Sequence, residues 1–302
     1  MISVIIPTHN RAELLVRAIK SVQNQTRKVD EIIVVSDGST DNTAEVMQRL
    51  CAEDSRIRFI EYHPGINGNH ARNVGIESAN GEYLAFIDDD DEWMPHKTEM
   101  QMKVFENNPE VGLVYSGQLM KYTDLEYSYC TKPVGKGDLS KRILVHNDIA
   151  GPVCSMIKKD VIVKAGLFDE ELLAQQDYDL WIRVTPITLV DYVYEPCVTI
   201  YNSIGSGQIT SNTEKYIKSK KRILEKYEDR IQQYDKEYQS QIYSAANLAI
   251  ARRCMRNNEG KDARRYIGMA WKIKKSKSCI ALYLASFCKF KMVLMVRSRF
   301  KY

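Results

Sequence analysis

Residues 1–88 alternate between short apolar runs and stretches whose apolar side chains recur at helical spacing. The apolar runs predict four buried strands, at 2–7, 31–39, 57–63 and 82–88. The helical spacing predicts three helices between them, at 11–25, 40–53 and 69–81. We expect the first strand to stop at Pro7 and the third helix to close at Gly81. This alternation predicts an α/β fold with a mostly parallel sheet, covered by helices on both faces.

Acidic residues lie at the ends of two of these strands. Asp37 lies near the end of the second strand, and four consecutive aspartates, Asp88 to Asp91, begin at the end of the fourth. Four like charges repel one another and are costly to bury without partners, so we expect a positive group beside them. Alternate carboxylates such as Asp88 and Asp90 suit a hard divalent cation that keeps room for water and phosphate oxygens. The alternative is a solvated acidic turn before a helix that starts near Pro95.

Charge divides the chain into two parts. The net charge is only +4, but residues 213–302 carry 23 lysines and arginines against eight acidic residues. Residues 1–212 carry 20 against 31. This asymmetry indicates an acidic globular part and a basic part that faces something anionic. From residue 213 onward the pattern predicts a charged helix at 213–245 and one or two further helices at 242–272.

The seven cysteines form no Cys-x-x-Cys pair, and their odd number indicates reduced thiols. The first ten residues lack a basic n-region, and their apolar run is too short for a signal peptide. No uninterrupted apolar run reaches about 18 residues, so we expect no membrane-spanning helix. These features predict a cytoplasmic protein.

Four motifs occur in order along residues 1–205. They read VIIPTHNR, IIVVSDGSTDNT, ARNVGIESANGEYLAFIDDDD and QQDYDLWIR. In this order and approximate spacing they resemble the family 2 glycosyltransferases. The resemblance implies a GT-A (Rossmann-like) fold, a nucleotide-sugar donor, a divalent cation (Mn²⁺ or Mg²⁺) and inversion at the anomeric carbon. It implies a catalytic domain at 1–212, with a nucleotide-sugar half at about 1–115 and an acceptor half at about 116–212, followed by a helical region at 213–302.

The same resemblance implies a role for each matching donor-side residue. Pro7, His9 and Arg11 belong to the loop that lines the nucleotide pocket in the family. Asp37 matches a carboxylate that accepts a hydrogen bond from a uracil-like N–H, since an ionised carboxylate is an acceptor only. Its alternative role is a turn or a helix cap. Arg72 matches a basic residue near the diphosphate, and the alternative is an ordinary surface arginine.

Asp88 and Asp90 match the outer carboxylates of the family's metal-binding Asp-x-Asp signature, and Asp89 between them is assigned to donor binding. A cation that bridges two phosphates would stabilise a departing nucleotide. The sequence leaves open which of the four aspartates touches the metal and which touches ribose. Some relatives supply a late histidine to the metal, but residues 197–212 contain none.

An inverting reaction needs one group that takes the proton of the acceptor hydroxyl. The motif QQDYDLWIR aligns with a family segment that commonly carries Glu-Asp before an aromatic residue, which makes Asp177 the base. Gln176 stands where the acidic partner usually lies. Asp179 is the competing candidate for the base. Alternatively, both aspartates only favour the helix N-terminus through its dipole.

The last thirty residues mix bulky apolar side chains with scattered lysines and arginines. Helices of this kind can lie in a bilayer interface with their lysines toward anionic head groups. The alternative is packing on the catalytic domain or on a second copy, which leaves a homo-oligomer open. The tail has no nucleic-acid-binding motif and the front of the chain is acidic, so we expect no nucleic-acid partner.

The combined interpretation is an inverting glycosyltransferase. It would transfer a sugar, most simply from a UDP-sugar, to a hydroxyl of a glycan or lipid-linked acceptor in surface polysaccharide biosynthesis, as a peripheral protein on the cytoplasmic face of the membrane. One alternative is a nucleotidyltransferase, but the first strand is not followed by a glycine-rich basic loop. The other is a non-catalytic assembly subunit, which would be expected to have lost Asp37, Asp88, Asp90 and Asp177.

Overall fold

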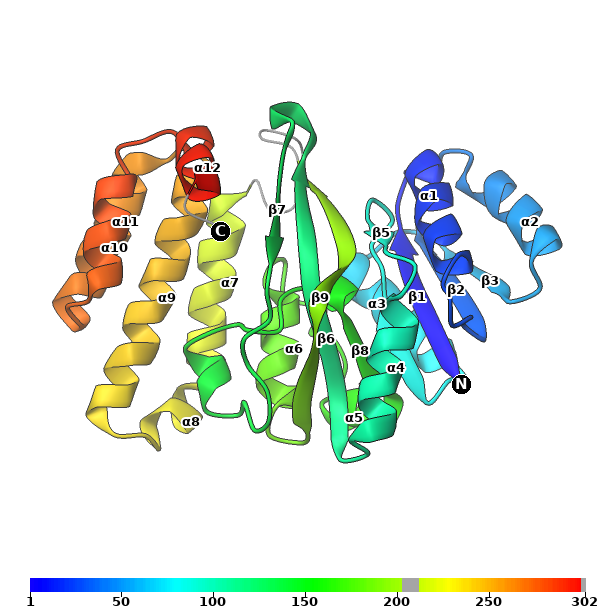
Figure 1. Cartoon of the computed structure of the whole chain (residues 1–302), viewed down its shortest axis with the longest axis horizontal. Helices are drawn as coiled ribbons and strands as arrows, with labels where there is room; N and C mark the ends of the chain where they lie inside the picture. Colours follow the sequence, from blue (N-terminus) through cyan, green and yellow to red (C-terminus); the bar gives the residue numbers. More distant parts are fainter. Residues whose placement is uncertain (203–211, 300–302) are drawn as a thin grey trace. The chain divides into compact units, whose positions relative to one another are not determined.

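A computed structural model describes residues 1–202 and 212–299, with side chains to Leu294. Within residues 1–202, nine strands form one sheet (Figure 1). The strands are β1 Ile2–Thr8, β2 Glu31–Asp37, β3 Ile57–Tyr62, β4 Tyr83–Phe86, β5 Glu92–Trp93, β6 Val111–Tyr122, β7 Tyr127–Thr131, β8 Ser155–Lys158 and β9 Leu189–Asn202. Their order is β3-β2-β1-β4-β8-β6-β9-β5, with β7 paired to β6.

The sheet is parallel where the strand–helix alternation predicts it. The strands β3, β2, β1 and β4 run in the same direction, whereas β8 is antiparallel to both β4 and β6. The long strand β9 returns parallel to β6. The helices of this part are α1 Ala12–Gln23, α2 Thr43–Glu53, α3 Gly68–Ser78, α4 Lys97–Asn107, α5 Lys159–Lys164 and α6 Gln176–Val184, with short 3-10 turns at Thr123–Leu125, Arg142–Leu144 and Pro152–Cys154.

Successive side chains of a strand point to opposite sides of the sheet. Because both sets are apolar in β1, helices cover the strand on both sides. On one side, Val4 and Ile6 of β1 join the core cluster that contains Leu15 of α1. On the other side, Ile5 lies against Gly75 of α3, where an added Cβ would approach Ile5 Cγ2 to 2.5 Å. The strand is therefore buried along its whole length, as a continuous apolar run predicts.

The carboxyl ends of β1, β2 and β4 meet at one edge of the sheet, since the strands are parallel and in register. The predicted stop at Pro7 is wrong by one residue: β1 continues to Thr8, which pairs with Ser36 of β2. The φ angle of proline fits an extended strand, so the missing amide does not end it. This edge carries the loops that hold the candidate site.

The predicted closure of the third helix at Gly81 is also wrong, because α3 ends at Ser78. The next turn is held by Glu31, whose carboxylate accepts hydrogen bonds from the backbone and side-chain nitrogens of Asn80 at 3.0 and 2.9 Å. Gly81 instead lies against β1, with its amide 2.9 Å from Ser3 Oγ. An added Cβ at Gly81 would lie 2.5 Å from the same oxygen, which explains the glycine.

The chain divides into two units. The first comprises Met1–Ile143, Asn147–Glu171 and Gln176–Asn202, and the second comprises Leu144–His146, Leu172–Gln175 and the C-terminal residues. In the part of the second unit that the structure describes, the helices are α7 Thr213–Lys226, α8 Glu228–Gln232, α9 Lys236–Arg256, α10 Gly260–Ile273, α11 Lys277–Ala285 and α12 Phe290–Arg299.

The second unit has its own core, in which α9 packs against α10 (Figure 1). Ala251 and Cys254 of α9 are fully buried there with Ala263 and Ala270 of α10. The single helix predicted at 213–245 is wrong, because Asp235 starts a new helix by accepting the amide of Tyr238 at 2.8 Å. Among the described helices, none is long and apolar enough to cross a bilayer.

Candidate active site

The four aspartates form a turn between β4 and β5. Asp89 and Asp91 are buried and tied to the fold: Asp89 Oδ2 accepts a hydrogen bond from Thr8 Oγ1 at 2.8 Å, and Asp91 Oδ1 accepts the amide of Tyr201 at 3.2 Å. The side chains of Asp88 and Asp90 are 38% and 25% exposed. The alternate residues Asp88 and Asp90 are therefore the pair that an incoming ligand can reach.

Arginines supply the positive charge that the aspartate turn needs. Arg11 Nη1 lies 3.0 Å from Asp89 Oδ1 and 2.9 Å from Asp90 Oδ2. Arg72 Nη2 lies 2.6 Å from Asp88 Oδ1, and its guanidinium is almost buried beside the ring of Phe168. The structure thus brings together four of the predicted residues, Arg11, Arg72, Asp88 and Asp90, around one point.

Burial and mutual repulsion disfavour the charged form of the carboxylates. Burial raises the pKa of Asp89 to about 6, although Arg11 and Thr8 oppose the change. Burial, with the charges of Asp88 and Asp90, raises the pKa of Asp91 to about 9. Burial and Asp88 also raise the pKa of Asp90. Raised pKa values mean that an added positive charge would stabilise the cluster.

A third arginine, which the sequence did not single out, donates a hydrogen bond to the backbone of the aspartate turn. Arg17 of α1 donates from Nη2 to the backbone oxygen of Asp90 at 2.5 Å, and its guanidinium lies 4.2 Å from the ring centroid of Tyr201. Tyr201 in turn donates its hydroxyl to Glu92 Oε2 at 2.8 Å. Arg17 looks like an ordinary helix arginine in the sequence, so only the fold reveals this contact.

Asp37 lies at the end of β2 beside a neighbouring aromatic residue. Its Oδ1 accepts hydrogen bonds from the Tyr62 hydroxyl at 2.9 Å and from the Ile66 amide at 2.6 Å. Among the described residues no donor reaches Oδ2, so one oxygen of this nearly buried carboxylate is free for a ligand N–H. Burial and the hydrogen bond to Asp37 raise the pKa of Tyr62, which keeps this hydroxyl a donor.

The loops around Asp37 are fastened to one another. His9 Nδ1 lies 2.6 Å from the backbone oxygen of Asp37, and Asn10, at a φ of 53°, accepts the Thr40 amide through Oδ1 at 2.7 Å. Gly38 has a φ of 67°, and a Cβ there would lie 2.4 Å from the nitrogen of Gly65. The loops after β2 and β3 therefore meet backbone to backbone, and the side chains of His9 and Asn10 join the loop after β1 to them.

Asparagines in α3 and at its N-cap form hydrogen bonds with residues 168–170, which precede Asp177 in the sequence. Asn67 and Asn69 donate to the backbone oxygens of Glu170 and Asp169, each at 3.0 Å. Asn73 donates to the Phe168 oxygen at 3.0 Å and accepts the Phe168 amide at 2.9 Å. These contacts give Asn73 a structural role, because its side chain takes the place of a strand partner for residue 168.

We expect Asn73→Ala to lower the free energy of unfolding by about 2 kcal/mol, because the substitution leaves the buried amide and oxygen of Phe168 without partners. The matched control is Asn24→Ala, an exposed asparagine at the end of α1, for which we expect a change below about 0.5 kcal/mol. Urea denaturation of both variants gives the comparison. Equal changes in the free energy of unfolding would contradict the stabilising role of Asn73.

Asp177 lies in the first turn of α6 and is partly buried. Asp179 is fully buried, and its Oδ2 accepts hydrogen bonds from Arg183 Nη2 at 2.8 Å and Nε at 3.1 Å. A carboxylate held in this way inside one helix is committed to the fold. The structure thus gives Asp179 a role in the fold, and the assignment of Asp177 as the base stays a prediction.

The carboxylates suit part of a metal site. Across residues 1–202 and 212–299, no group of three or more His, Cys, Asp or Glu side chains could hold a metal ion alone. Asp88 and Asp90 nevertheless offer accessible oxygen donors of the kind that Mg²⁺ and Mn²⁺ prefer. Since Mg²⁺ is commonly held by one or two carboxylates plus phosphate oxygens and water, this pair fits a cation that binds together with a diphosphate.

The parallel strands and the helices that cover both of their faces place the chain among the α/β proteins. The model of the family described as "Glycosyl transferase family 2" matches residues 3–165. The chain therefore belongs to glycosyltransferase family 2.

Two curated relatives and two solved structures agree with this assignment. An uncharacterized glycosyltransferase of Haemophilus influenzae is 30% identical over 61% of the chain and 62% of its own length. The GalNAc(5)-diNAcBac-PP-undecaprenol beta-1,3-glucosyltransferase of Campylobacter jejuni is 35% identical over 61% of the chain and 59% of its own length. The chain thus covers about three fifths of these two relatives.

The structural comparisons place the fold among GT-A glycosyltransferases and confirm the predicted fold class. Residues 1–349 of S. aureus TarS in complex with UDP-GlcNAc match with a TM-score of 0.65 at 14% identity, over 100% of this chain and 92% of that one. A mannosyltransferase of Pyrobaculum calidifontis in complex with GDP-Man and Mn²⁺ matches with a TM-score of 0.59 at 16% identity, over 98% and 84%.

Proposed function

We propose that this protein transfers a sugar from a nucleotide-sugar donor to an acceptor hydroxyl, with inversion at the anomeric carbon. The observation that carries the proposal is the accessible pair Asp88 and Asp90, flanked by Arg11 and Arg72 at the carboxyl edge of the sheet. The arrangement offers both carboxylates for a cation and guanidinium groups for phosphate oxygens. A bound Mg²⁺ or Mn²⁺ would neutralise the charge that develops on the departing diphosphate.

The donor is a uridine nucleotide in this proposal. The free Oδ2 of Asp37 is an acceptor, and uracil presents an N–H where cytosine presents an unprotonated nitrogen. Pro7, His9 and Asp89 complete the donor side: Pro7 lies near the end of β1, His9 shapes the loop that follows, and Asp89 fixes Arg11 beside the phosphates. The similar TarS structure contains UDP-GlcNAc, which supports a UDP-linked sugar.

The transfer itself is a single displacement. Asp177 takes the proton of the acceptor hydroxyl while the oxygen of that hydroxyl forms a bond to the anomeric carbon. The bond from that carbon to the diphosphate oxygen breaks at the same time, and the nucleoside diphosphate leaves with the electron pair. The guanidinium groups of Arg11 and Arg72, which lie beside the aspartate turn, would donate hydrogen bonds to the departing diphosphate.

The acceptor is a glycan or a lipid-linked glycan of a surface polysaccharide. The named acceptor of the Campylobacter relative, a glycan on undecaprenyl diphosphate, supports this class. We further propose that the protein works at the cytoplasmic face of a membrane, where the basic helices of the second unit contact an anionic surface. The catalytic division into a donor half at 1–115 and an acceptor half at 116–212 belongs to the same proposal.

Donor hydrolysis tests the proposal. The purified protein is incubated with UDP-, GDP- and dTDP-sugars, with Mn²⁺ or with a chelator, and nucleoside diphosphate release is measured. We expect release from a UDP-sugar that depends on the metal and falls about tenfold or more for Asp37→Ala. No binding or turnover of any donor with metal would favour the non-catalytic assembly subunit. Release of pyrophosphate from a nucleoside triphosphate would favour the nucleotidyltransferase.

A further inference from the structure

Helix α11 has an unusual combination of composition and exposure. After Lys277 and Ser278, all of its residues are apolar or aromatic, yet Cys279 is its one buried side chain. The exposed fractions of Ile280, Tyr283 and Leu284 are 52%, 46% and 65%, and that of Phe287 in the following turn is 63%. A helix that is apolar on all sides normally lies in an apolar environment, so α11 is suited to a contact beyond its own unit.

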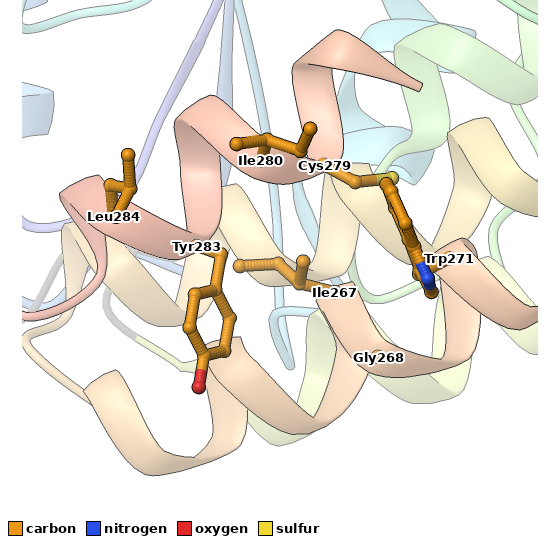
Figure 2. Close-up of a pocket in the computed structure, with 7 residues that line it drawn as sticks. All are labelled: Ile267, Gly268, Trp271, Cys279, Ile280, Tyr283 and Leu284. Atoms are coloured by element: carbon orange, nitrogen blue, oxygen red, sulfur yellow. The ribbon is translucent and has the colours of Figure 1, made fainter. Parts of the chain in front are cut away.

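A groove accompanies these exposed side chains. Between α10 and α11 lies an apolar pocket of about 300 Å³, which Figure 2 shows. It is lined by Ile267, Gly268, Trp271, Cys279, Ile280, Tyr283 and Leu284. A Cβ added at Gly268 would meet nothing within 4 Å, so the groove is open along α10. A pocket of this size and lining suits a segment of hydrocarbon chain.

The charge around the groove indicates what covers it. Asp262 is the last acidic residue of the chain, and residues 263–302 contain eleven lysines and arginines. Exposed lysines stand on both sides of α11 in the sequence, at Lys272 and Lys275 before it and at Lys289 and Lys291 after it, and Lys277 is exposed at its first position. A second copy of the chain that docked through this same face would bring the same positive charge to it, whereas anionic head groups would neutralise it.

We propose that α11 and the α10–α11 groove dock onto an anionic phospholipid bilayer, with Ile280, Leu284 and Phe287 in the interface and one lipid hydrocarbon chain in the groove. Trp271 and Tyr283 fit this position, since their rings prefer the boundary between apolar and wet regions. The inference rests on the proposed function, for which it names the surface that brings the enzyme to a lipid-linked acceptor.

Tryptophan fluorescence of the full chain tests the docking surface. Of the three tryptophans, Trp93 and Trp181 are buried, at 4% and 0% exposed, whereas Trp271 is 38% exposed. With vesicles of phosphatidylglycerol and phosphatidylcholine we expect a blue-shifted emission that lipids brominated on the acyl chain quench. Vesicles of phosphatidylcholine alone should leave the emission unchanged. An unchanged spectrum with the anionic vesicles overturns the proposal.

Two matched variants locate the contact. Leu284→Glu, at 65% exposed, should weaken binding to the anionic vesicles by about tenfold or more. Val163→Glu on α5, at 52% exposed, makes the same type of change elsewhere and should bind like the parent protein. Equal binding by Leu284→Glu and the parent, or a dimer in solution that Leu284→Glu disrupts without any vesicle binding, overturns the proposal.

Donor hydrolysis separates this inference from the proposed function. Leu284→Glu should release nucleoside diphosphate in vesicle-free solution at the parent rate, because the groove lies apart in the sequence from every proposed donor residue. If Leu284→Glu loses vesicle binding but keeps donor hydrolysis, the result supports both the docking surface and the proposed function. Vesicle binding by a parent protein that hydrolyses no donor would refute the proposed function and leave the docking surface standing.

Discussion

Replacing Asp177 by asparagine should lower nucleotide-sugar hydrolysis and transfer by roughly a hundredfold to ten-thousandfold, the range that one positioned general base contributes. Asparagine keeps the size and polarity of the side chain but cannot accept a proton. Because the donor would be held by Asp37, Arg11, Arg72 and the aspartate turn, its affinity should stay within about twofold of the parent value. Initial rates of nucleoside diphosphate release and calorimetric titration with the donor measure the two quantities.

The neighbouring Asp179→Asn variant is the matched comparison, since it changes the same atoms two residues away. Asp179 is fully buried in an ion pair with Arg183, so its replacement should lower the free energy of unfolding by on the order of 3 kcal/mol. Its catalytic rate, measured well below the melting temperature, should change far less than that of Asp177→Asn. The reverse result, with an active Asp177→Asn and an inactive but folded Asp179→Asn, would move the base to Asp179.

The first half of the fold could be predicted because its periodicity is strong. Runs such as residues 32–35 are apolar on both faces, and such runs form central parallel strands. Boundaries were less predictable, since they depend on contacts distant in the sequence. Gly81 resembles a helix end, but Glu31 holds Asn80 and ends the helix earlier. The break at Asp235 was missed because charged residues continue on both sides of this cap.

In the candidate site, too, some residues could be predicted from the sequence and others could not. Asp37 and the aspartate turn could be predicted because they lie at the carboxyl ends of parallel strands, where open α/β sheets bind their ligands. The supporting contacts carry no such signal in the sequence. Tyr62 and Arg17 are ordinary strand and helix residues until the fold brings them to Asp37 and to the oxygen of Asp90. The exposure of α11 was also hidden, since its composition equally predicts a buried helix.

The aspartate turn combines tight support with an incomplete charge balance. Asp89 and Asp91 are fixed by Thr8, Arg11 and the backbone of β9, which leaves the alternate pair to meet a ligand. Arg11 Nη1 bridges Asp89 and Asp90, so a cation held by Asp90 would compete with Arg11 for this carboxylate. We therefore expect Arg11 to exchange its carboxylate partners for phosphate oxygens when donor and cation bind together.

Asp90→Asn should remove the stimulation of donor hydrolysis by Mn²⁺, with a loss of about a hundredfold or more at saturating metal, because a neutral amide is a weak ligand for a hard cation. The fold should tolerate the change. Asp88 and burial already raise the pKa of Asp90, so removing its charge relieves repulsion while it gives up one partly exposed contact with Arg11. The melting temperature without metal should therefore stay within about 2 °C of the parent value.

Asp160→Asn gives the matched control, an acid-to-amide change in an exposed i,i+4 pair with Lys164 on α5. It should retain full metal stimulation and full Mn²⁺ affinity in the presence of UDP. Manganese binding followed by electron paramagnetic resonance distinguishes the two variants directly, since only the free hexaaqua ion gives a strong solution signal. If Asp90→Asn immobilises Mn²⁺ with UDP as well as Asp160→Asn does, the cation is held elsewhere and the assignment of Asp90 as a metal ligand is wrong.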